Sequence, residues 1–166
     1  MSEPAPKKAK PAYTFNVNKA LDKEFETKPL REVVQLPPSA LQGLADRANE
    51  MLAAFHVKTI ADLAQWKHAR IAQAICTLAA VEEEGKRDPS GESNINKALD
   101  KDYETKSLKE ISEAPVHCLQ GLADWTDSTL SKLNVKTVSD LANWKFVRWS
   151  QALVELAKFE SPDHSS

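Results

Sequence analysis

Apolar residues recur every three or four positions along most of the chain, and no stretch alternates apolar and polar residues as a half-buried β-strand does. Two helical stripes of this kind are formed by Ile71, Ile75 and Leu78, and by Trp149, Leu153 and Leu156. We expect both stripes to be buried, because one apolar face of a helix normally packs on the core. The pattern predicts an all-α protein made of short helices.

Capping signals indicate where several of these helices begin. A Thr or Ser followed three residues later by Asp or Glu is the signature of a capping box, in which each side chain bonds the other residue's backbone amide. Three pairs fit: Thr59 with Asp62, Thr137 with Asp140, and Ser107 with Glu110.

Four further polar residues are expected to cap helices. Asn18 and Asn96 precede a short apolar pair and would cap a first short helix. Asp46 and Asp124 follow a turn glycine and would cap the next helix.

The chain contains one unit written twice. A shift of 78 residues aligns 16–82 with 94–160 without a gap, with 34 identities in 67 positions. The sequence therefore predicts two homologous small domains of about five short helices each. Residues 83–93 are rich in charge, Gly, Pro and Ser and are expected to form a flexible linker. Residues 1–15 are expected to be a disordered basic arm, and 161–166 a disordered tail.

A mostly polar segment is kept almost unchanged in both copies. NKALDKEFETK begins at Asn18 and NKALDKDYETK at Asn96, and they differ at only two positions. A recent duplication of a solvated, salt-bridged helix accounts for this pattern. The other hypothesis is that each copy presents the same charged surface to the same kind of protein partner. The residues assigned to that surface are Lys19, Asp22, Lys23, Lys97, Asp100 and Lys101.

The segments that follow resemble the helix-hairpin-helix family. In each copy LQGLAD is followed by a helix and then by VKTIADL (57–63) or VKTVSDL (135–141). This resemblance covers about 25 residues of each copy and implies a helical hairpin. In nucleic-acid-binding members, the hairpin glycines let backbone amides approach a phosphate. Here the second glycine is an alanine and an aspartate follows it, which favours the family's protein-interaction or structural members.

Nucleic-acid binding stays open as an alternative. The hairpin glycines would then act with basic residues that share a helix face three positions apart. The residues concerned are Gly43, Lys67, Arg70, Gly121, Lys145 and Arg148.

The four tryptophans divide by position. Trp66 and Trp144 are equivalent and are expected at a corner of the core. Trp149 replaces Ile71 and is expected in the buried stripe. Trp125 lies in the first turn of a helix, where it would either anchor a partner or pack on the other copy.

Composition narrows the function further. The 166 residues are 42% apolar and 28% charged, with a net charge of −2, so neither half is a strong polyanion binder by charge. No apolar run approaches the roughly 20 residues of a membrane helix, and the N-terminal residues lack the apolar core of a secretory signal. We expect an intracellular protein, cytoplasmic or, if the KKAK at 7–10 is an import signal, nuclear. Cys76 and Cys118 are then expected to be reduced, the alternative being a disulfide between the two copies.

Catalytic and metal-binding patterns were not found. The four histidines have no spacing that suggests a metal site, and four glycines leave no phosphate-binding loop. The sequence therefore predicts no enzyme, no metal and no cofactor. It favours a non-catalytic bivalent protein-interaction or structural module. The alternatives are a nucleic-acid-binding protein and a binder of a small apolar ligand or pigment between helices.

Overall fold

The structure is a computed structural model that describes residues 16–85, 88 and 90–161. The predicted arm at 1–15 and residues 162–166 of the predicted tail lie outside this part. The all-α prediction is confirmed, since the described residues form helices and no named strand. The helices of the first repeat are α1 (Leu30–Val33), α2 (Arg47–Ala53), α3 (Ile60–Gln65) and α4 (Lys67–Ala79). Those of the second are α5 (Leu108–Ser112), α6 (Trp125–Ser131), α7 (Val138–Ala142) and α8 (Lys145–Ala157). Short 3₁₀ turns connect them at Lys23–Phe25, Pro38–Ala40, Asn96–Ala98, Lys101–Tyr103 and Val116–Cys118.

The three capping boxes are confirmed. Thr59, Ser107 and Thr137 each accept a hydrogen bond from the third amide of the following helix, and the acidic partner closes each box. These contacts fix the starts of α3, α5 and α7.

The other four capping predictions were wrong. Asp46 and Asp124 precede α2 and α6 but have helical backbone angles and make no side-chain cap bond. Their backbone is already helical, whereas a capping residue normally has an extended backbone that turns its side chain back onto the helix start. Asn18 lies in a turn and Asn96 lies inside a 3₁₀ helix preceded by Ile95, so neither caps the expected helix.

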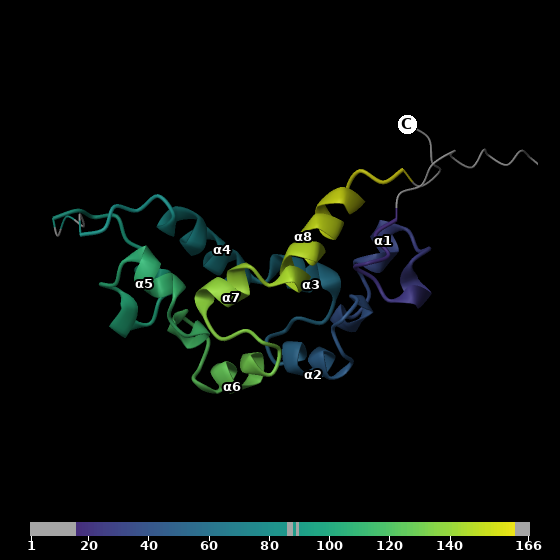
Figure 1. The fold of residues 1–166 in the computed structure, drawn as a ribbon, viewed down its shortest axis with the longest axis horizontal. Helices are drawn as coiled ribbons and strands as arrows, with labels where there is room; N and C mark the ends of the chain where they lie inside the picture. The colour runs from purple at the N-terminus through teal and green to yellow at the C-terminus, as the bar shows by residue number, and fades with distance from the viewer. Residues whose placement is uncertain (1–15, 86–87, 89, 162–166) are drawn as a thin grey trace, which may run out of the picture.

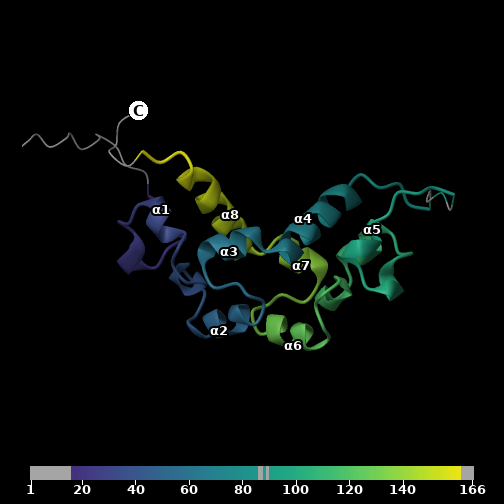
Figure 2. The same ribbon diagram turned by 180° about the vertical axis from the view of Figure 1, so that it is seen from behind.

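The last helix of each repeat packs against the other repeat. Helix α4 contacts α5 and α7, while α8 contacts α3 and α1. Figures 1 and 2 show α4 and α8 diverging from the centre toward opposite ends of the molecule, each above the short helices of the other copy. We call residues 16–65 with α8 the first lobe, and residues 94–143 with α4 the second lobe. The predicted division into two separate domains is not confirmed.

Helices α4 and α8 are thus exchanged between the repeats, and equivalent polar contacts on both sides hold them in place. Gln73 of α4 and Gln151 of α8 hydrogen-bond reciprocally through their amide groups, each at 2.9 Å. Glu160, after α8, accepts bonds from the backbone amides of Leu30 and Arg31 at the start of α1. Glu82, after α4, does the same for Leu108 and Lys109 at the start of α5. Each residue in these contacts has its counterpart 78 positions away in the other repeat, so the two lobes are related by an approximate two-fold axis.

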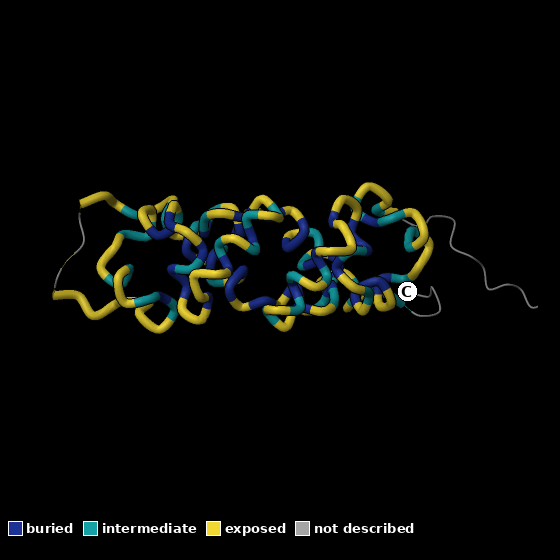
Figure 3. Tube along the Cα trace, turned by 90° about the horizontal axis from the view of Figure 1, so that it is seen from below, coloured by how far each residue is buried: buried dark blue, intermediate teal, exposed yellow. Residues whose placement is uncertain are grey.

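One buried core runs through both lobes. Figure 3 shows buried segments following one another through the central part of the molecule, while the ends of the long axis are exposed or intermediate. Trp66 and Trp144 are buried, as predicted. Trp149 is only partly buried but packs against the core. The predicted stripes are wrong at their ends, because Leu78 and Leu156 are more than half exposed.

Candidate functional site

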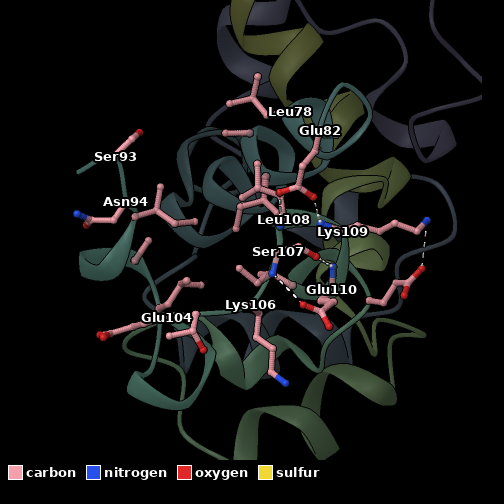
Figure 4. Close-up of a pocket in the computed structure, with 18 of the residues that line it drawn as sticks. Leu78, Glu82, Ser93, Asn94, Glu104, Lys106, Ser107, Leu108, Lys109 and Glu110 are labelled. Atoms are coloured by element: carbon pink, nitrogen blue, oxygen red, sulfur yellow. Dashed lines mark hydrogen bonds and ion pairs between the residues drawn. The ribbon is translucent and has the colours of Figure 1, made fainter. Parts of the chain in front are cut away.

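An open groove lies between α4 and the start of the second repeat. It encloses about 1090 Å³. Its apolar lining comes from α4, from the segment before α5 and from α5 itself: Ile71, Ile75, Leu78, Ile95, Leu99, Leu108 and Ile111. Figure 4 shows Leu78 and Glu82 at one end of the groove and Glu104 and Lys106 at the other. The exchange of helices creates this groove, because its two walls belong to different repeats.

The repeated polar segment forms one wall of the groove. Ala98, Leu99 and Glu104 of NKALDKDYETK line it. Two backbone bonds hold the segment in place, one from Asp100 N–H to Cys118 O and one from Gln120 N–H to Ala98 O. The first repeat makes the same pair, between Asp22 and Ala40 and between Gln42 and Ala20. This pairing buries Leu21 and Leu99, while the lysines around them stay exposed.

Matching apolar side chains project from the ends of both exchanged helices. Leu78 is 56% exposed and Val81 75%, and their counterparts Leu156 and Phe159 are 54% and 77% exposed. An isolated exposed leucine needs no explanation, but the same exposed pair at both equivalent positions indicates two related surfaces.

The lobes differ at the floor of the groove. Ile71 of α4 is replaced in α8 by Trp149, whose larger ring packs against the core. Trp149 meets the Phe146 ring edge to face, with 5.6 Å between ring centroids. The Lys145 ammonium lies 5.3 Å from both ring centroids. The first lobe therefore places a bulky aromatic side chain where the second has a smaller aliphatic one.

Both cysteines are free thiols. Cys118 is buried. Its pKa is raised to about 12, mainly by burial and to a smaller extent by the nearby carboxylates of Asp100 and Asp127. Cys76 is half-buried and borders a smaller pocket of about 400 Å³, which Lys109 and Arg148 also line. Burial raises the pKa of the Cys76 thiol as well, although a hydrogen bond with Ser139 opposes this. A raised pKa lowers the thiolate fraction at neutral pH, so both thiols are weak nucleophiles.

The predicted partner residues fall into three places. Lys19 and Lys23 are exposed in the first lobe, and Lys97 and Lys101 in the second. Their two segments lie at opposite ends of the molecule (Figure 1). Asp22 and Asp100 are half-buried beside them.

Trp125 lies apart from both charged segments. It starts α6, near α2, and is 51% exposed. Its ring stacks on Phe55 of the first repeat, with centroids 5.4 Å apart and an interplanar angle of 12°. Packing on the other copy, one of the two alternatives from the sequence, is therefore observed.

The exchange pairs each hairpin glycine with the helix of the other repeat. Gly43 has a φ of 96°, and a Cβ placed there would lie 3.6 Å from the Phe146 ring beside Lys145. Gly121 has a φ of 97°, and a Cβ placed there would lie 3.3 Å from Nε2 of the His68 ring, which is beside Lys67. An aromatic ring thus covers this side of each glycine. The basic residues assigned to nucleic-acid binding, Lys67, Arg70, Lys145 and Arg148, are all exposed.

His68 is a buried polar residue that replaces Phe146 in the symmetric position. Its Nε2 lies 2.9 Å from Gln120 O, and its Nδ1 is buried without a partner among the described residues. Burial lowers the pKa of His68, outweighing the opposite effect of that backbone bond. The ring is therefore held neutral at physiological pH and packs at the interface between the two repeats, inside the second lobe.

Sequence reasoning missed the polar residues that join the two repeats. These are Gln73, Gln151, Glu82 and Glu160, polar residues identical in the two repeats. The available signal was that the same polar residue stands next to an apolar stripe in both repeats. The sequence does not show whether such a side chain bonds within its own repeat or across to the other one.

Comparison with known proteins found no matching family model, no similar curated protein and no similar solved structure. Among the described helices, none has the length and apolar character needed to cross a bilayer. In the same part of the chain, no three His, Cys, Asp or Glu side chains are grouped as metal ligands.

Proposed function

We propose that this protein is a non-catalytic, bivalent protein-binding module. The observation that carries the proposal is that the two lobes share two exposed features at equivalent positions. These are the lysines of an NKALDK segment, and an apolar pair at the end of the helix contributed by the other repeat.

Two features make these surfaces suited to a protein partner. Exposed Leu, Val and Phe side chains next to charged residues are the composition of a small interface with an apolar centre and a polar rim. Two such surfaces on one chain raise the apparent affinity for a partner with two equivalent sites, since the second contact forms within the same complex.

Paired substitutions at the helix ends test the proposal. L78S/V81S alters the second lobe and L156S/F159S alters the first. All four side chains are exposed, so we expect little change in stability. A partner would be captured from cell extract with the wild-type chain, identified by mass spectrometry and purified. Its affinity for the three proteins and for the four-fold variant would then be measured by surface plasmon resonance.

Bivalent binding has a distinct signature in this experiment. Each paired variant should weaken binding by about tenfold or more, and the four-fold variant should abolish it. Wild-type affinity in all variants would refute the proposal. Capture of nucleic acid with an affinity that collapses as salt rises would support the nucleic-acid alternative instead.

A further inference from the structure

The groove of the second lobe has a strongly acidic rim. Six glutamates and two lysines line it, a formal charge of −4: Glu82, Glu83, Glu84, Glu104, Glu110 and Glu113, with Lys106 and Lys109. Glu82 and Glu110 already accept bonds from backbone amides, and Glu113 lies 3.7 Å from Lys109. The rim therefore acts mainly as a negative field around the groove, and Glu83, Glu84, Glu110 and Glu113 are exposed to solvent.

The first lobe does not repeat this charge. At the equivalent positions it carries three glutamates (Glu26, Glu32 and Glu160) and, in place of Gly85, Asp163, against Lys28 and Arg31, a formal charge of −2. Ser161 replaces Glu83, Pro162 replaces Glu84 and Gln35 replaces Glu113. Trp149 also replaces Ile71. The second lobe thus combines a smaller floor residue with a more acidic rim, and both changes act on the same surface.

The apolar part of the groove has the spacing of a helix-binding site. Ile71, Ile75 and Leu78 follow one another along α4 over about 11 Å. Ile75 and Leu99 are buried at the floor, whereas Leu78 and Ile95 are exposed at the edges. An amphipathic helix fits such a surface by placing residues i, i+4 and i+7 in the groove.

Resting on the proposed function, we propose that this groove binds a basic amphipathic helix of a partner protein. The apolar stripe of that helix packs against α4 and α5, and lysines or arginines on its flanks face the acidic rim. The rim selects a basic partner and speeds its association, while the apolar floor supplies most of the affinity. The first lobe, with Trp149 and a weaker field, binds this class of helix more weakly.

Two synthetic helical peptides test the proposal with the full chain. Both carry leucines at i, i+4 and i+7; one has lysine and the other glutamate at the flanking positions. Amide NMR titrations at two salt concentrations locate and quantify binding. We expect the lysine peptide to shift groove amides and to bind at least about tenfold more tightly than the glutamate peptide.

The first lobe supplies the variants, since each substitution copies its own residue. I71W should fill the groove and remove lysine-peptide binding while the protein stays folded. E83S/E113Q should reduce the preference for lysine by about threefold or more. W149I is the matched control and should leave binding at the second lobe unchanged.

Several results would overturn the proposal. If both peptides bind equally and I71W blocks both, the groove binds helices without selecting charge. If neither peptide shifts groove amides, the groove does not bind this class of helix; the proposed function would still be decided separately by the helix-end variants. If decanol shifts these amides and the lysine peptide does not, the groove is a small-ligand site.

Occupation by the chain itself would also overturn it. A variant with Lys7, Lys8 and Lys10 replaced by glutamate would shift groove amides without peptide if residues 1–15 fill the groove. Groove shifts that depend on protein concentration would indicate a second copy as the occupant.

Discussion

The reciprocal Gln73–Gln151 pair allows a direct test of the exchange between repeats. Each amide donates one hydrogen bond to the other at 2.9 Å, and each nitrogen is also 3.4 Å from a backbone oxygen of a facing helix. A neutral hydrogen bond contributes about 0.5–1.5 kcal/mol net. Q73A or Q151A alone therefore removes both reciprocal bonds and should lower the free energy of unfolding by about 1–3 kcal/mol.

The informative quantity is the coupling between the two substitutions. Since either substitution breaks the same two bonds, Q73A/Q151A should cost little more than one of them. We expect a coupling energy of about 1–2 kcal/mol in a double-mutant cycle. Urea unfolding followed by fluorescence of the four tryptophans and by circular dichroism would measure it, with a single transition in the wild-type protein.

Gln42 and Gln120 provide the control for this cycle. They are also equivalent glutamines, but both are exposed. Their alanine substitutions should be nearly neutral and additive. Additivity within about 0.3 kcal/mol for the Gln73 and Gln151 pair as well would refute the exchange, because α4 and α8 would then not meet.

Three further predictions concern single residues. Burial opposes the Glu160 charge, but bonds from the Arg31 and Leu30 amides outweigh it and lower the pKa of this carboxyl. A lowered pKa stabilises the fold above the unfolded-state pKa, and the contribution is lost as pH falls through the folded-state pKa. E160Q should therefore lower the free energy of unfolding by about 1–2 kcal/mol at neutral pH. It should also make this free energy depend less on pH in urea titrations between about pH 3 and 7, a range that spans the usual carboxyl pKa values. W125A should cost about 0.5–1.5 kcal/mol through loss of the Phe55 stack, measured by urea unfolding. In a thiol-labelling assay near pH 8, below the raised pKa of about 12, Cys118 should be unreactive in the folded protein and Cys76 slow, and both should react in urea.

Matched controls exist for these as well. E82Q makes the corresponding change in the second lobe, and R47A changes the residue equivalent to Trp125. Unchanged acid sensitivity in E160Q, equal costs for W125A and R47A, or fast labelling of Cys118 in the folded protein would each contradict the corresponding contact.

Local features were readable from the sequence, and long-range ones were not. The capping boxes at Thr59, Ser107 and Thr137 involve residues three apart, so sequence spacing decides them. Sequence spacing does not decide which repeat a helix packs against, because the stripe of Ile71 and Ile75 fits the apolar surface of either repeat equally well. With homologous surfaces in one chain, periodicity cannot tell which repeat a helix joins.

The candidate site was partly readable for the same reason. The repeated NKALDK segment was recognised, but its neighbour across the groove comes from the other repeat and depends on the exchange. Asp46 and Asp124 show a second limit. Their spacing is right for a cap, but both have helical backbone angles and neither makes a side-chain cap bond, which spacing alone does not reveal.

The approximate two-fold axis has a consequence for how this molecule could diversify. In a homodimer, every substitution appears at both ends, so a residue that suits one end but harms the other cannot persist. Joining the two halves in one chain removes that constraint and fixes their stoichiometry at one to one. Trp149 opposite Ile71, and Phe146 opposite His68, are differences that a homodimer could not acquire. The chain keeps the architecture of a symmetric dimer while its two ends are free to specialise.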